Sequence, residues 1–95
     1  MICTVGFITI HIPYAQSLKE KRRVVKSVIA RTIGKFSVSC IEADYCDLWQ
    51  KAMIGIGYVS SDQGQADKIE NRIRAFYEEF GEFEILDMSF EKFTV

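Results

Sequence analysis

The chain has 95 residues, of which 48% are hydrophobic and 26% charged, and its formal net charge is −1. This length predicts one domain over residues 1–95, and this composition argues against a disordered or fibrous protein. The longest apolar stretch, residues 5–12, is interrupted by polar residues and has no basic segment before it, so we expect a cytoplasmic protein with no membrane span and no signal peptide.

The first third of the chain predicts a strand followed by a basic helix. Residues 2–12 alternate in polarity and are rich in β-branched side chains, as strands are. Ser17 and Glu20 have the spacing of a capping box, in which the serine hydroxyl accepts from the amide three residues later and the glutamate reaches back. A helix is therefore expected over residues 18–33, with Gly34 at its end.

The rest of the chain predicts two strands, a second helix and a last strand. Ser60, Ser61 and Asp62 are N-cap candidates for the helix, and Gly81 is placed to end it. An apolar stripe at helical spacing lies between them: Ile69, Ile73, Phe76, Tyr77 and Phe80. The strands are expected over residues 36–43, 49–60 and 82–95, with a turn at 44–48.

This order of elements, β-α-β-β-α-β, is that of an α+β ferredoxin-like fold. Right-handed crossovers put both helices on one face of a four-stranded antiparallel sheet and leave the other face bare. Val5 and Phe7 in the first strand, and Met53 and Val59 in the third, point to that bare face. An apolar sheet face is unfavourable in water, so we expect a homodimer that covers it, with Phe7, Trp49 and Met53 at the interface.

The charges are unevenly distributed along the chain. Residues 1–35 hold seven basic side chains and one acid, whereas residues 36–95 hold five basic and twelve acidic ones. Most of the early cations lie where the first helix begins, at its positive dipole end, where acids are the locally favoured residues. Clustered cations beside free backbone amides predict a phosphate site, which gives a nucleic-acid-binding set of Lys19, Lys21, Arg22, Arg23 and Lys26.

A second interpretation of the same residues stays open. A run of charges is often no more than a solvated face, and the two helices are expected to lie side by side. Acids of the second helix are then available to pair with the cations of the first: Asp67, Glu70, Glu78 and Glu79.

No motif predicts catalysis, a metal site or a cofactor. The three cysteines indicate free thiols in a reducing compartment, and with His11 they have no zinc-ligand spacing. The acids of the 42–47 segment match no metal-binding pattern. Residues 13–16 contain no glycine, unlike the phosphate loop of acylphosphatases, which share this topology.

Trp49 is a candidate for stacking on a base, or for an anchor in the core or a dimer interface. Since the third strand lacks the aromatic motif of RNA-recognition domains, binding of RNA on the sheet face is not expected.

Several segments resemble a known family. Residues 15–25, AQSLKEKRRVV, resemble the signature of the YlxP-like proteins, a bacterial family of unknown function. The segments 35–42 and 47–52 are similar to two further motifs of that family, with serine, cysteine and lysine replacing some of its usual residues, and Gly55 and residues 59–61 follow in register. The resemblance implies a ferredoxin-like fold. Members of the family are commonly encoded near translation genes, and the resemblance therefore implies a role in ribosome assembly or RNA binding.

Two hypotheses for the function follow. The first is a non-enzymatic protein that binds RNA or a ribosomal particle through the basic start of its first helix. The alternative is a dimeric protein-interaction or small-ligand regulatory domain. The first predicts cations without partners in the folded chain, and the second predicts cations neutralised by carboxylates.

Overall fold

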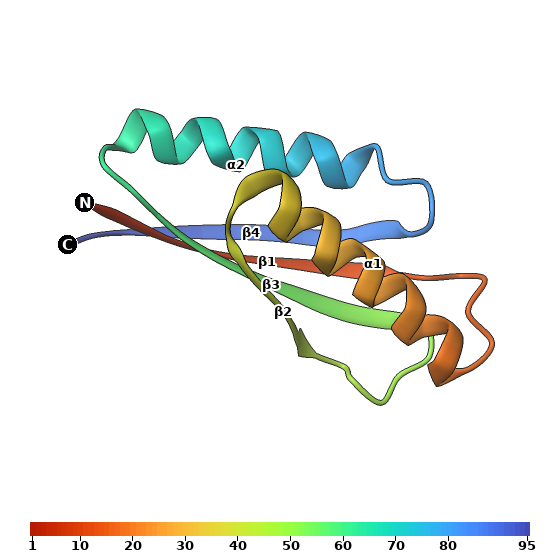
Figure 1. Cartoon of the computed structure of the whole chain (residues 1–95). Helices are drawn as coiled ribbons and strands as arrows, with labels where there is room; N and C mark the ends of the chain where they lie inside the picture. Colours follow the sequence, from red (N-terminus) through yellow and green to blue (C-terminus); the bar gives the residue numbers. More distant parts are fainter.

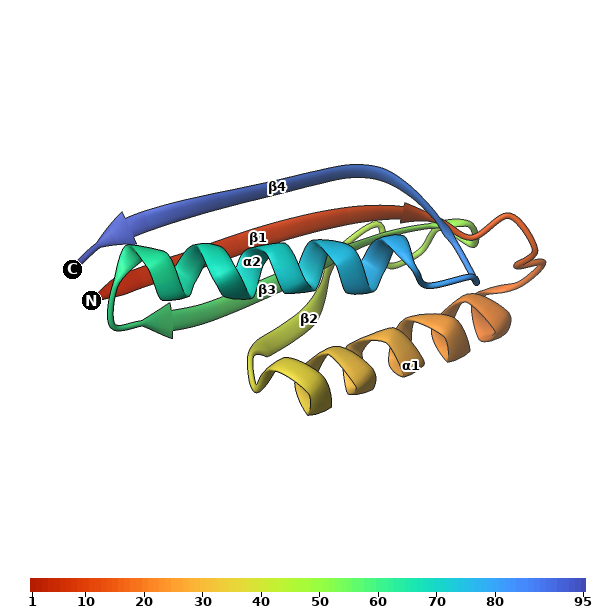
Figure 2. The same ribbon diagram turned by 90° about the horizontal axis from the view of Figure 1, so that it is seen from above.

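The computed structural model describes residues 1–95 and has the predicted order of elements. The strands form one antiparallel sheet in the order β2-β3-β1-β4, and both helices cover the same face of it (Figures 1 and 2). The prediction of a ferredoxin-like α+β fold is confirmed. The elements are β1 (Ile2–His11), α1 (Leu18–Phe36), β2 (Ser39–Asp44), β3 (Lys51–Ser60), α2 (Gln63–Glu78) and β4 (Glu84–Thr94).

The core lies between the helices and the central strands β1 and β3. Side chains alternate across a strand, so every second residue of each strand faces the helices. Ile8 and Ile10 of β1 and Ile54 of β3 are completely buried there, against Val28 of α1 and Ile73 of α2. Burying aliphatic side chains of this size stabilises the fold by about 1.5–3 kcal/mol each.

The opposite sheet face is apolar and open, as the sequence predicts. Phe7 is 38% exposed, Val59 62% and Phe93 51%. Phe7 pairs with Gly55 on one side and with Ser89 on the other, so neither neighbour carries a large side chain to cover the ring. This face therefore leaves aromatic and aliphatic side chains in contact with solvent.

Helix α1 is longer than predicted. Its start is as expected, because the Ser17 hydroxyl accepts from the Glu20 amide at 3.1 Å and the Glu20 carboxylate accepts from the Gln16 amide at 2.7 Å. Its end at Gly34 is wrong. The helix continues to Phe36, whose ring packs edge-on against Phe76 of α2, and it stops at Ser37 in the left-handed conformation. Packing against α2 outweighs the cost of a glycine inside the helix, and β2 accordingly begins at Ser39 rather than at residue 36.

Helix α2 begins at one of the three predicted caps. The Asp62 carboxylate accepts from the Gln65 amide at 2.8 Å. The helix ends at Glu78, before Gly81, and its residues Ile73 and Tyr77 are fully buried. Neither helix is long and apolar enough to cross a membrane.

Candidate functional site

The basic residues at the start of α1 divide into one buried and four exposed side chains. Lys19, Arg22, Arg23 and Lys26 are exposed, and none has a carboxylate within ion-pair distance or an aromatic ring beneath it. We refer to these four residues as the basic ridge. Local structure explains why they share a side: on a helix, residues three, four and seven positions apart lie on one face.

Lys21 does not belong to this surface, so the prediction that it contacts nucleic acid is wrong. Its side chain is completely buried and points toward β2, where its Nζ lies 2.5 Å from a carboxylate oxygen of Glu42. The same Nζ donates to the carbonyl oxygens of Tyr45, at 2.9 Å, and Cys46, at 3.4 Å. The sequence carried a signal for this, because Lys21 precedes Val25 by four positions and so falls on the apolar face of the helix.

The cations elsewhere in the chain, except Lys68, have partners. Of the twelve lysines and arginines, three pair with carboxylates and four lie over aromatic rings: Lys21, Arg74 and Lys92, then Arg31, Lys35, Lys51 and Arg72. The five without such a partner are the basic ridge and Lys68 of α2. Four of the five unpaired cations thus lie within eight residues of the sequence.

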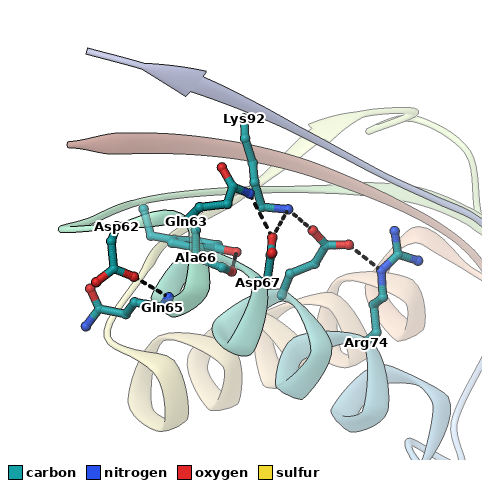
Figure 3. Close-up of polar contacts among 9 residues, drawn as sticks. Asp62, Gln63, Gln65, Ala66, Asp67, Arg74 and Lys92 are labelled. Atoms are coloured by element: carbon teal, nitrogen blue, oxygen red, sulfur yellow. Dashed lines mark hydrogen bonds and ion pairs between the residues drawn. The ribbon is translucent and has the colours of Figure 1, made fainter.

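The acids of α2 do not neutralise the basic ridge. Lys92 of β4 lies 3.2 Å from Asp67 and contacts Glu70, and Arg74 donates to Glu70 at 2.8 Å (Figure 3). Burial by itself raises the pKa of a carboxyl, but the hydrogen bonds from Lys92 and Arg74 outweigh it and hold the pKa of Glu70 below its usual value. Glu78 and Glu79 form no ion pair. Pairing between the two helices, one part of the second interpretation of the sequence, is therefore wrong within one chain, while its other part, a solvated charged face, stays open.

The course of α1 explains this separation. The helix approaches α2 in its second half and diverges from it toward its start (Figure 1). Where the helices are close, aromatic rings of α2 and of the loop that follows it take the place expected for acids: Lys35 lies 5.1 Å from the centre of the Phe76 ring in α2, and Arg31 lies 4.7 Å from that of Phe80 in the loop. The start of α1 lies beyond this contact.

Two hollows adjoin the basic ridge. The first is a shallow groove along the ridge itself, from Ser17 to Lys26. The second is a cavity of about 410 Å³ between the β1–α1 loop, α1 and the α2–β4 loop. Glu20 and Arg23 line both hollows. The cavity was not predicted, because its walls come from segments almost 70 positions apart in the sequence.

The residues predicted for a dimer interface occupy two places. Phe7 and Met53 lie on the open sheet face, in the neighbouring strands β1 and β3. Trp49 lies in the loop before β3, which begins at Lys51 rather than at residue 49. Its side chain is 54% exposed and borders a shallow hollow with His11 and Leu48, so it is not a core residue.

The remaining candidates for chemistry are dispersed. His11 Nδ1 lies 3.4 Å from Glu84, and no group of three or more His, Cys, Asp or Glu side chains gathers at one place. Cys3 is half-buried, Cys46 exposed and Cys40 buried. Burial raises the pKa of the Cys40 thiol and of the Tyr77 hydroxyl beside it, so both stay neutral. Tyr77 shares a 2.6 Å hydrogen bond with Thr32, which links α2 to α1 inside the core.

Comparisons with known proteins agree with the resemblance of the sequence. Residues 3–90 match the family described as "Protein of unknown function (DUF503)". The uncharacterized protein YlxP of Bacillus subtilis (strain 168) is 46% identical over 70 residues, which cover 74% of this chain and 76% of the relative. These descriptions name no activity.

Proposed function

The chain belongs to the DUF503 family of proteins of unknown function, and from the surface of its first helix we propose that it is a non-enzymatic protein that binds RNA, free or in ribosomal particles. The observation that carries the proposal is the basic ridge, Lys19, Arg22, Arg23 and Lys26, which the folded chain leaves without carboxylate or aromatic partners.

The position of the ridge makes this absence of partners informative. A helix presents partial positive charge at its N-terminus, so an exposed cation in the first turn, where Lys19 lies, is typically unfavourable by about 0.3–1 kcal/mol, and this effect fades over the following turn, which holds most of the ridge. Glu20 is the only acid between residues 17 and 26, and its carboxylate accepts from the Gln16 amide. An external anion supplies the missing negative charge, and phosphate groups are the anions that clustered lysine and arginine bind.

The length of the ridge suits a nucleic acid. With a rise of 1.5 Å per residue, the seven positions from Lys19 to Lys26 span about 10 Å along the axis. One strand of a nucleic acid carries a phosphate at every nucleotide, so a ridge of this length can contact more than one of them. Binding through such contacts is largely independent of sequence and weakens as the salt concentration rises.

Charge reversal tests the proposal, and the chain offers a matched control. Arg22→Glu and Lys68→Glu make the same change in net charge, but only Arg22 belongs to the ridge, while Lys68 is an unpaired cation of α2. We expect Arg22→Glu to weaken binding of a structured RNA about tenfold, with a flatter dependence on salt, and Lys68→Glu to change it less than about twofold. The measurement is fluorescence anisotropy between 50 and 200 mM salt. Undetectable binding at low salt, or equal losses in the two variants, would show that the proposal is wrong.

We also propose that the protein is a homodimer through its open sheet face, as the alternative hypothesis requires. One specific observation favours this: Phe7, Val59, Phe93 and Ile41 of that face are between 38% and 63% exposed in the single chain. Apolar surface of this kind is stabilised when a second copy covers it.

A pair of isoleucines tests the dimer. Ile41 lies on the open face and Ile33 on α1, and they are 63% and 43% exposed. Ile41→Lys should convert a dimer to a monomer in light scattering coupled to gel filtration, whereas Ile33→Lys should leave it a dimer. A wild-type monomer at 100 μM, or a dimer that persists with Ile41→Lys, would contradict the proposal.

A further inference from the structure

We infer that the cavity beside the basic ridge binds an unpaired RNA base that carries an exocyclic amino group, while the ridge holds the phosphates next to it. The inference rests on the proposed function and deepens it, because it adds a preference for single strands and for certain bases.

The walls are suited to a flat ring with polar edges. The cavity of about 410 Å³ falls within the range of roughly 300–1,000 Å³ that is usual for small-molecule pockets. Val24 is half-buried and supplies apolar surface to the cavity, whereas Ile12 and Ala15 are almost completely buried and add little. Such surface accepts the face of a base once the base has left its stack.

The polar groups at the cavity favour hydrogen-bond donors on the ligand. Glu20 and Glu82 line it from α1 and from the α2–β4 loop. One oxygen of Glu20 accepts from the Gln16 amide, and its other oxygen has no partner; Glu82 has no hydrogen bond or ion pair in the chain. Carboxylates only accept, so they select an amino group such as N4 of cytosine over a carbonyl such as O4 of uracil.

One exposed aromatic side chain lines the cavity and makes no contact that stabilises the fold: Tyr14. Tyr14 is 83% exposed, packs against no other aromatic ring and makes no hydrogen bond through its hydroxyl. Exposed aromatic rings beside cationic grooves are the usual stacking platforms for single-stranded nucleic acids.

The position of the cavity connects it to the ridge. Arg23 lines both hollows, so a nucleotide whose phosphate contacts Arg23 has its base within reach of the cavity. A duplex cannot use this arrangement, because its bases are stacked and paired. The occupant is therefore a single-stranded segment of RNA.

The test compares oligo(C) with oligo(U). The two bases differ mainly in the group expected to contact the carboxylates, which is an amino group in cytosine and a carbonyl in uracil. We expect 12-nucleotide oligo(C) to bind the wild type about fivefold or more tightly than oligo(U) of the same length in anisotropy titrations at one salt concentration. The ratio of the two affinities is the readout, because both probes carry the same phosphates. Equal, measurable binding of the two probes would overturn the base pocket and leave the proposed function standing. Absence of binding by both would overturn the proposed function, and the pocket with it.

Variants then locate the preference. Ser27 lines the cavity, so the larger side chain in Ser27→Phe should fill it. This variant should bring the ratio of the affinities for oligo(C) and oligo(U) to one and preserve the affinity for oligo(U). Asn71→Phe adds the same ring to the exposed side of α2, away from the ridge, and should keep the wild-type ratio. Glu82→Gln, at an exposed position that does not threaten folding, should also bring the ratio close to one. A preference for oligo(C) that survives both Ser27→Phe and Glu82→Gln would overturn the inference.

Discussion

In the second half of α1, Lys35 lies over an aromatic ring of α2 and Arg31 over one in the loop that follows α2, whereas the residues of the basic ridge, in the first half, contact no partner. The same helix thus uses cations in two ways. Those near α2 contribute to the packing of the fold, and those of the basic ridge contribute nothing that the single chain needs. The comparison separates charges that stabilise the molecule from charges that are available to a ligand.

Lys21 gives the strongest test of this separation, because it is a cation of the first half that the fold does use. Lys21→Ala leaves Glu42 without its counter-charge in a largely buried place and releases the carbonyls of Tyr45 and Cys46. Removing one partner of a buried ion pair typically costs about 3–5 kcal/mol, so we expect a loss of this size in the free energy of unfolding, measured with urea. Lys19→Ala, two positions earlier and exposed, should change it by less than about 0.5 kcal/mol. Similar losses for the two variants would remove the distinction between buried and exposed cations.

Glu70 extends the comparison to the acids, because it is a carboxylate that the fold uses in ion pairs. Its hydrogen bonds with Lys92 and Arg74 lower its pKa in the folded chain. A lowered pKa means that its contribution is fully present above the usual value of 4.5 and is lost as the pH falls through the folded value. Glu70→Gln should therefore reduce the free energy of unfolding by about 1 kcal/mol at pH 7 and by less near pH 3. Denaturation of both proteins between pH 7 and pH 3 measures this, with Glu78→Gln as the control without an ion pair. A difference between wild type and Glu70→Gln that is the same at pH 7 and pH 3 would contradict it.

Arg31 tests the smallest contribution, that of a cation over an aromatic ring. Arg31→Ala removes the contact with Phe80 and should lower the free energy of unfolding by about 0.5–1 kcal/mol. Arg23→Ala, on the exposed ridge, should leave stability within about 0.5 kcal/mol of the wild type. The two variants should show the opposite order in RNA affinity, since only Arg23 belongs to the ridge. Equal stability of both variants would mean that the second half of α1 does not depend on its cations.

Features that depend on near neighbours were predictable from the sequence. The order of the elements follows from periodicity, and the caps at Ser17 and Asp62 follow from side chains that bond amides three residues away. The alternation in β1 and β3 gave both the buried face and the open apolar face. The concentration of cations at the start of α1 was also predictable, because these residues are close together in the sequence.

What only the tertiary structure decided concerns partners distant in the sequence. Gly34 does not end α1 because Phe36 packs against Phe76, 40 positions later, and this contact has no local signature. Lys21 is buried because Glu42 and the β2–β3 loop fold over it, and the α2 acids bond to Lys92 because β4 passes beside them. Sequence periodicity assigns a residue to a face of its own helix or strand. The other elements of the fold decide whether a charge on that face meets an opposite charge, an aromatic ring or water.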